Sequence, residues 1–334
     1  MIQYLIKRFL FLIPTLLGVC ILVFSIIHLI PGDPAVAMLG EHATPQAVTR
    51  LRKQLGLNRP LYVQFGKFIK GIFTLNLGRS IQTNEPALQE VLHHYPATIE
   101  LAAAAMITAI FFGFTLGVTA ACFPNTWIDY IVNVFSLTGI SMPIFWLGLL
   151  FLLLFASHWR LFPFSGRIFP GYIFPTPTHF YIIDSLLTGN FQIIKDVLGH
   201  LILPSLTLST IPLAILTKTV RGSLLDVLHQ EYIRTAYAKG VSRWKVIWKH
   251  ALKNAFIPVV TIAGLQFGYL LGGAILTETV FGWPGIGRLV VEAVKARDYP
   301  VLQAAVLLIA FTFVFINTLT DLIYAYTDPR IHYT

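Results

Sequence analysis

The sequence predicts an all-α polytopic membrane protein with six transmembrane helices. Of its 334 residues, 56% are hydrophobic and only 12% are charged, whereas soluble domains carry about 25% charged residues. Apolar runs of roughly 20 residues, the length that crosses a bilayer core, recur along the chain. Because the bilayer core offers no water to backbone polar groups, we expect each of these runs to form an α-helix.

The first predicted span covers residues 9–30. Lys7 and Arg8 precede it, and the Pro-Gly-Asp-Pro run that begins at Pro31 ends it. Its apolar run is longer than the core of a signal peptide, and no small-residue cleavage site follows it. We therefore expect a retained span with the N-terminus in the cytoplasm.

A polar segment, residues 31–97, follows this span. Pro45, preceded by a threonine suited to an N-cap, predicts a helix that ends before Gly56. Pro60 and Pro86 predict the starts of two further helices. We expect the segment to form a small helical cap on the outer face of the membrane.

Five further spans are predicted after this segment. Their ranges are 98–122, 130–156, 201–220, 256–276 and 302–324. The third span contains Gly139, Pro143 and Gly148, which predict a kink or close packing. Residues 157–199 are rich in proline, glycine and aromatic residues, and we expect them to loop back over the membrane surface. Glycines in the fifth span predict close helix contact, at Gly264, Gly268, Gly272 and Gly273.

Six spans place both termini on the same side of the membrane, and Lys7 and Arg8 favour the cytoplasm for that side. The polar stretch after the fourth span, with its cations between Arg221 and Lys253, then lies in the cytoplasm as well. Cation counts over the whole chain do not by themselves favour this orientation, because eleven lysines and arginines fall on the inner side and thirteen on the outer side. Seven of the external cations, however, belong to the long segment 31–97. Long loops are largely exempt from the positive-inside rule, by which lysine and arginine concentrate in cytoplasmic loops.

The most informative stretch, which we call the polar island, covers residues 231–258. It is predicted to form two short helices joined by a turn. Ile233, Ala236 and Tyr237 are spaced i, i+3, i+4 and form one narrow apolar face. Gly240 is a typical helix stop. A short amphipathic helix in a loop of a membrane protein favours docking into a groove of a partner protein.

The polar island also allows a simpler interpretation. Residues 231–240 then form a solvated amphipathic connector. Cations recur at every fourth residue along one side of the second helix, at Lys245, Lys249 and Lys253. For these lysines we favour contact with anionic lipid headgroups.

The chain lacks the motifs of several enzyme classes. No Walker A motif occurs, because Gly66 and Lys67 are followed by Phe68 rather than Ser or Thr. No H-E-x-x-H, C-x-x-C or G-x-S-x-G motif is present. We therefore expect no catalytic residue, metal or cofactor on this chain, so that energy comes from a partner or an ion gradient.

Neither the cysteines nor the net charge indicates another class. Cys20 and Cys122 lie in or at the end of apolar spans and are expected to be small buried side chains. His93 and His94 are adjacent and point to different sides of a helix, which disfavours a metal site. The net charge of +9 is spread over loops without a basic patch interleaved with aromatic residues, so we expect no nucleic acid partner.

Charged residues inside the predicted spans are few. Glu100 and Lys218 fall near span ends, where interface depth or snorkelling explains them. Asp321 lies within the sixth span, and an intramembrane charge is a candidate functional group. For Asp321 we favour a structural pairing or helix-end role, with a proton or substrate role as the alternative.

The polar island resembles the cytoplasmic loop motif of bacterial importer-type ABC permeases. That motif is a short helix that begins Glu-Ala-Ala and has a glycine six residues after the glutamate. Gly240 matches the glycine and Ala236 the second alanine, whereas Arg234 and Thr235 replace the glutamate and the first alanine. Pro258 also comes later than in sugar importers. The segments YIRTAYAKG and HALKNAFIPVV are nevertheless very similar to the peptide-importer branch, which tolerates these departures.

The resemblance covers nearly the full length. Blocks similar to the dipeptide and oligopeptide permeases occur in the same order: IPTLLGV, IPGDPA, LGLNRPLYVQF, GISMPIFWLGL, ILTETVFGWPGIGR and DLIYAYTDPRI. The match looks closest to the first permease subunit of the dipeptide branch. Nickel, glutathione and antimicrobial-peptide importers share much of this pattern, so the substrate is the least specific implication.

The resemblance implies an importer-type ABC permease fold with a cytoplasmic coupling helix, in a bacterial inner membrane. Residues 1–30 would form the N-terminus and first span, 31–97 an external helical segment, and 98–334 a five-helix core with a coupling loop at 222–255. The implied partners are a second homologous permease, two ATP-binding subunits that hold ATP and Mg, an external or periplasmic substrate-binding protein, and membrane lipid. The chain itself would be a transporter subunit and not an enzyme.

The resemblance also assigns roles within the polar island. The implied coupling residues are Glu231, Ile233, Arg234, Thr235, Ala236, Tyr237, Lys239 and Gly240. Ile233, Ala236 and Tyr237 would face a groove of the ATPase, and Gly240 would permit a left-handed turn. Arg234 and Lys239 would pair with acidic residues on the rim of that groove. The residues of the substrate pathway are not predicted.

Two other function classes are compatible with a polytopic membrane protein. A gradient-driven secondary transporter needs protonatable groups at the membrane midplane and usually inverted repeats. Asp321 is the one candidate for such a group, and no internal repeat is evident. A membrane scaffold that transports nothing is the third hypothesis and the least supported.

Overall fold

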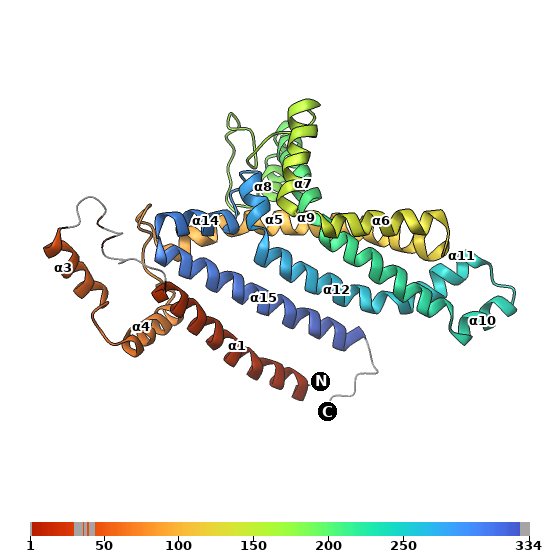
Figure 1. Cartoon of the computed structure of the whole chain (residues 1–334), viewed down its shortest axis with the longest axis horizontal. Helices are drawn as coiled ribbons and strands as arrows, with labels where there is room; N and C mark the ends of the chain where they lie inside the picture. The colour runs from red at the N-terminus through yellow and green to blue at the C-terminus, as the bar shows by residue number, and fades with distance from the viewer. Residues whose placement is uncertain (1, 30–35, 37–38, 40–43, 328–334) are drawn as a thin grey trace. The chain divides into compact units, whose positions relative to one another are not determined.

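The computed structural model describes residues 2–29, 36, 39 and 44–327, and these residues form helices and loops (Figure 1). No β-strand occurs among them, apart from one isolated bridge between Arg79 and Pro86. The chain divides into two compact units. Unit 1 comprises Met1–Pro96 and Pro284–Thr312, and unit 2 comprises Ala97–Trp283 and Phe313–Thr334. The predicted division at residues 30 and 97 stays a prediction.

Unit 1 contains the first helix and two short helices of the polar segment. Its helices are α1 (Ile2–Leu29), α3 (Pro45–Leu55), α4 (Leu61–Phe73), α14 (Ile286–Ala296) and the first parts of α5 (Ala87–Cys122) and α15 (Tyr299–Thr327). The ring of Phe24 in α1 contacts Phe65 of α4 edge-on, with centroids 5.3 Å apart. Asp298 caps α15 and also accepts hydrogen bonds from Ser80 Oγ (2.6 Å) and Ile81 N (2.8 Å). The cap thus fixes the loop before α5 to the start of α15.

The helix boundaries of the polar segment follow the predicted caps. Thr44 Oγ1 accepts from Ala47 N at the start of α3, and Gly56 ends the helix with φ +77°. Helix α4 begins directly after Pro60. The third predicted helix begins after Pro86 as expected, but it continues without a break to Cys122. It is therefore one helix with the predicted second span.

Unit 2 is organised around α9 (Phe191–Leu228), which packs against α6, α7, α8 and α12. Its other elements are the remaining parts of α5 and α15 together with α6 (Trp127–Ser141), α7 (Ile144–Phe151), the π-helix η2 (Leu152–His158), α8 (Tyr181–Thr188), α10 (Glu231–Ala238), α11 (Arg243–Lys245), the π-helix η3 (Val246–Ala251), α12 (Leu252–Gly273) and α13 (Ile275–Val280). Helix α8 and the start of α9 lie inside 157–199, which the sequence predicts as a loop. Gly189 ends α8 with φ +66°, and the Asn190 side chain then caps α9.

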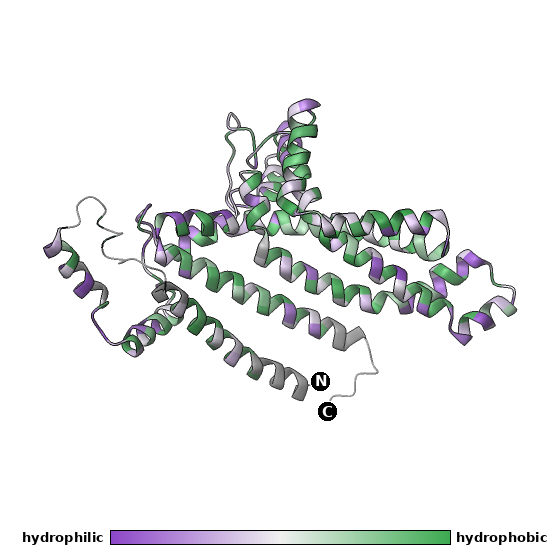
Figure 2. Ribbon diagram, viewed as in Figure 1, coloured by the Kyte–Doolittle hydropathy of each residue, from purple (hydrophilic) through white to green (hydrophobic). Residues whose placement is uncertain are grey.

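Four described helices are long and apolar enough to cross a membrane (Figure 2). They are Ala87–Cys122, Phe191–Leu228, Arg243–Gly272 and Tyr299–Leu322. Helix α6 and the α7–η2 helix together form a fifth candidate that is bent by 104°. The kink predicted for the third span is confirmed, because the break falls at Pro143, which cannot continue the hydrogen bonding of α6. Helix α1 contributes a shorter apolar stretch, Leu12–Ser25, so the polytopic all-α class is confirmed while the number six stays a prediction.

Glycines bring the long helices of unit 2 into close contact. A Cβ atom at Gly117 of α5 would lie 2.7 Å from Thr217 O and from Val220 Cβ of α9. Gly113 precedes it by four residues and faces Leu213 O at 3.0 Å, so α5 carries a G-x-x-x-G contact that we did not predict. The predicted close contact in α12 is confirmed at two of its glycines: Gly264 and Gly268 face Thr320 and Asn317 of α15.

The close approach of α5 and α9 is tested by Gly117→Val. The added side chain overlaps the α9 backbone, and overpacking of this kind costs about 1–3 kcal/mol. We expect a clearly lower melting temperature in detergent. Gly222→Val is the matched control, because a Cβ at Gly222 in α9 meets no atom within 4 Å. Equal melting temperatures for the two variants would contradict the packing of α5 on α9.

Candidate functional site

Helix α10 rests on unit 2 through one buried side chain. Ile233 has no exposed surface and belongs to the main hydrophobic core of unit 2, which also contains Leu224, Val246 and Ile247. Ala236 is half-buried and packs against the same core. Ile233 therefore attaches α10 to its own chain, and its side chain faces the core rather than a partner.

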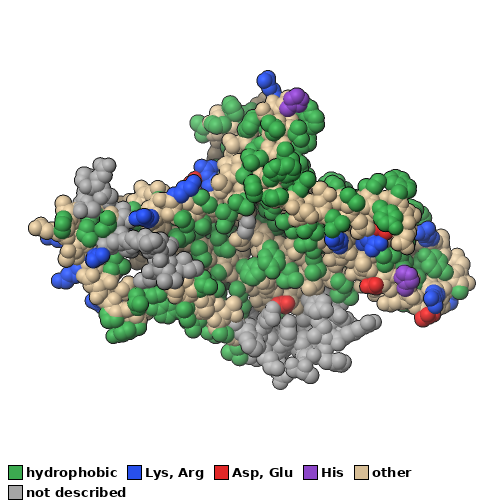
Figure 3. All heavy atoms as spheres, in the orientation of Figure 1, with side chains coloured by type: hydrophobic (Ala, Val, Ile, Leu, Met, Phe, Trp, Pro, Cys, Tyr) green, Lys and Arg blue, Asp and Glu red, His purple; other side chains and the backbone are tan. Residues whose placement is uncertain are grey.

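The remaining predicted coupling residues are exposed and lie on α10 or in the two residues after it, and Figure 3 shows the charged side chains at this end of unit 2. These residues are Glu231, Arg234, Thr235, Tyr237, Lys239 and Gly240. Tyr237 is 43% exposed. Glu231 and Arg234 pair at 2.9 Å, but their side chains are largely exposed, so this pair contributes at most about 1 kcal/mol to stability. The surface thus offers an aromatic ring and two cations for contact.

Gly240 ends α10 as the sequence predicts. Its φ of +77° is in the left-handed region, which favours glycine. Gly240 N donates to Tyr237 O (2.9 Å) and Val241 N donates to Ala236 O (3.2 Å), the paired bonds of a Schellman motif. A Cβ here would meet no atom within 4 Å, so backbone conformation alone requires the glycine.

The second half of the polar island passes through α11 and η3 into α12. The three lysines are exposed, and so are two neighbouring indoles, Trp244 and Trp248. Tryptophan and lysine together are typical of a membrane interface, so the lipid contact stays our preferred interpretation for the lysines. Asn254 Nδ2 donates to Tyr232 Oη (2.8 Å), which joins α12 to α10.

The turn between α5 and α6 holds two contacts that sequence reasoning missed. Asp129, at the start of α6, forms a two-bond ion pair with Arg221 of α9, at 2.6 and 2.7 Å. Arg243 of α11 donates to the carbonyl oxygen of Cys122, the last residue of α5. The partners are separated by 92 and 121 residues, so no local pattern could have paired them.

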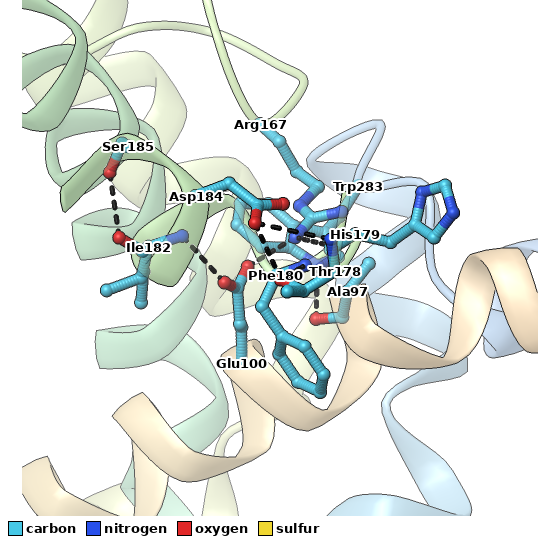
Figure 4. A network of polar contacts seen from close by, with 10 residues as sticks. All are labelled: Ala97, Glu100, Arg167, Thr178, His179, Phe180, Ile182, Asp184, Ser185 and Trp283. Carbon is cyan, nitrogen blue, oxygen red and sulfur yellow. Dashed lines mark hydrogen bonds and ion pairs between the residues drawn. The ribbon is translucent and has the colours of Figure 1, made fainter. Parts of the chain in front are cut away.

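A second buried polar cluster lies between α5 and the loop before α8 (Figure 4). Glu100 pairs with Arg167, and each side chain is only 5% exposed. The guanidinium of Arg167 also stacks on the ring of Tyr181 at 3.8 Å. Glu100 Oε1 accepts from Ile182 N (2.8 Å), so the carboxylate joins α8 to α5. Glu100 is therefore buried and paired within unit 2, while its expected position at interface depth stays a prediction.

Asp321, the predicted intramembrane site, does not belong to this cluster. It lies in α15 and is half-buried. Its structural and proton-transfer roles both stay predictions. Among the described residues, no group of three His, Cys, Asp or Glu side chains could hold a metal ion.

Two family descriptions match almost the whole chain. Residues 113–333 match the binding-protein-dependent transport system inner membrane component, and residues 1–102 match the N-terminal part of such membrane components. The first match includes α9, the polar island and the α6–α7 break. The second includes α1 and the polar segment.

Curated relatives match over similar lengths. A dipeptide transport system permease protein of Alkalihalophilus pseudofirmus is 49% identical over 333 residues, 100% of each chain. A probable D,D-dipeptide transport system permease protein of Escherichia coli is 44% identical and covers 94% of this chain and 93% of its own length. A glutathione transport system permease protein of Salmonella paratyphi A is 42% identical over 100% of both chains. The chain is therefore a multi-pass inner-membrane protein that belongs to the family of inner membrane components of binding-protein-dependent transport systems.

Proposed function

We propose that this chain is a permease subunit of an ATP-driven importer of dipeptides. It forms the translocation pathway with a second, homologous permease. Two ATP-binding subunits, which hold ATP and Mg, dock on its cytoplasmic face, and an external binding protein delivers the substrate. Support for the dipeptide comes from relatives up to 49% identical over the full length that are named for dipeptide transport.

The proposal includes six spans with both termini in the cytoplasm. The apolar stretch Leu12–Ser25 of α1 supports an additional span beside the five candidates in the rest of the chain. Lys7 and Arg8 support a cytoplasmic N-terminus. The polar island then faces the compartment that contains ATP.

Energy enters through the exposed surface of α10. The observation that carries this proposal is the division of the helix: Ile233 is fixed in the core of unit 2, while Tyr237 and the cations face outward. A partner that grips the outward face therefore moves the core of the permease with it. Closure of the ATP-binding subunits then shifts the permease between inward-facing and outward-facing states, because the two states differ in their affinity for that partner.

Gly240→Val tests this coupling. Valine is strained at a positive φ, by about 1–2 kcal/mol, and the strain changes the direction in which the chain leaves α10. In proteoliposomes with all subunits, we expect fewer dipeptides imported per ATP hydrolysed, with normal insertion of the subunit.

Gly189→Val is the matched control for Gly240→Val. Gly189 also has a positive φ, of +66°, with open space around its Cβ position, but it ends α8 in the predicted outer loop. We expect this control to retain the wild-type ratio of import to hydrolysis. Full coupling in the Gly240 variant would refute the role of α10.

Tyr237→Ala tests the contact surface itself. Loss of an exposed aromatic contact at an interface centre costs about 2 kcal/mol or more in binding, so we expect weaker retention of the ATP-binding subunits in a pulldown. Tyr62→Ala removes a tyrosine of α4 that is more exposed than Tyr237, at 77% against 43%, and serves as the control. Equal retention by both variants counts against this surface.

Substrate and energy source are tested on the purified complex with its binding protein. We expect dipeptides to stimulate ATP hydrolysis more than glutathione does. Stronger stimulation by glutathione favours the alternative supported by the Salmonella relative.

The energy source is tested by dipeptide uptake. ATP-dependent uptake should continue in Asp321→Asn and after collapse of the proton gradient. Uptake that stops with the gradient but survives without ATP supports the secondary transporter instead.

A further inference from the structure

We propose that the turn between α5 and α6, residues 122–129, relays motion from the polar island to the bent α6–α7 span. Asp129, Arg221 and Arg243 are its positioning residues. This inference rests on the proposed coupling through α10, and it assigns a route from that helix into the membrane part of unit 2.

Asp129 holds the turn rigidly on α9. Its side chain is 3% exposed, and both oxygens bind the side-on fork of Arg221. The remaining acceptor sites receive Asn125 N (3.0 Å) from the turn and Asn133 Nδ2 (2.8 Å) from the next turn of α6. One carboxylate therefore joins the turn, the start of α6 and the cytoplasmic part of α9.

Arg243 joins the same turn to the polar island. It lies three residues after Gly240 and donates to the carbonyl of Cys122, one of the acceptors that α5 leaves without an intrahelical partner at its end. The guanidinium also lies over the ring of Phe123, 5.8 Å from its centroid. A cation at a helix C-terminus is favoured by the helix dipole, so this contact is electrostatically matched.

The relay leads from these contacts to the break at Pro143. Helix α6 packs along α9, where Gly139 approaches Thr210 O (3.6 Å from a Cβ position) just before the helix ends at Ser141. Motion of the polar island therefore acts on α6 at its first turn, through Arg243 and the 122–129 turn. At the other end of α6 the span bends by 104°, and the motion changes the direction of the span at this bend.

The test uses the complete reconstituted complex and four readouts: retention of the ATP-binding subunits, melting temperature, ATP hydrolysis and dipeptide import. In Arg243→Gln we expect the subunits to be retained and ATP to be hydrolysed, while import per ATP falls about 5-fold or more, the lower end of typical coupling effects. Arg243→Lys keeps a charge and a donor and should recover part of that ratio. Arg288→Gln, which breaks the exposed Arg288–Glu292 pair in α14, is the control and should match the wild type.

Arg221→Lys tests the second contact, because lysine keeps the charge but cannot form the two-bond fork. We expect a reduced ratio of dipeptides imported to ATP hydrolysed here as well. The relay is overturned if Arg243→Gln and Arg221→Lys import as many dipeptides per ATP as the wild type. It is equally overturned if they lower only the melting temperature. Failure of the proposed function looks different, since Tyr237→Ala then leaves the ATP-binding subunits fully retained.

Discussion

Burial of Ile233 in the core of unit 2 is the contact on which the proposed coupling site depends. Enclosure of an isoleucine side chain stabilises a fold by about 1.5–3 kcal/mol, and here it fixes which face of an eight-residue helix points outward. The Schellman motif at Gly240 then sets where the chain leaves the helix. A helix this short is not stable by itself, so its orientation comes from the side chain that it buries.

Close packing of the long helices transmits a displacement of α10, which Ile233 attaches to the core, to the rest of unit 2. Gly113 and Gly117 let α5 approach the α9 backbone, and Gly264 does the same for α12 and α15. Because interiors packed in this way respond to displacement as a unit rather than by local deformation, a force on α10 is not absorbed at Ile233. The buried ion pair of Asp129 and Arg221 extends this rigidity to the start of α6.

Helix ends could be predicted from the sequence. Which surface each helix face contacts could not. The bounds of α10 and α3 follow from nearby residues such as Gly240 and Gly56, because caps involve only adjacent turns. The i, i+3, i+4 spacing correctly grouped Ile233 with Ala236. Spacing alone, however, does not distinguish a face that packs on its own chain from one that contacts a partner.

Longer-range features escaped prediction for related reasons. Pro143 indicated a kink, but the 104° angle depends on how α7 packs against α9 and α13. Arg221 and Asp129 lie 92 residues apart, so their pairing has no local signal. The G-x-x-x-G of α5 was visible in the sequence and was overlooked, whereas its counterpart in α12 was predicted and confirmed.

The most direct test of the account is site-specific photo-cross-linking in the assembled complex. A cross-linking residue at position 237, or at 234, should capture an ATP-binding subunit, because both side chains lie on the outward face of α10. The same residue at exposed Tyr62 should capture none. Capture from position 62 with none from α10 would contradict the proposal that energy enters through this helix.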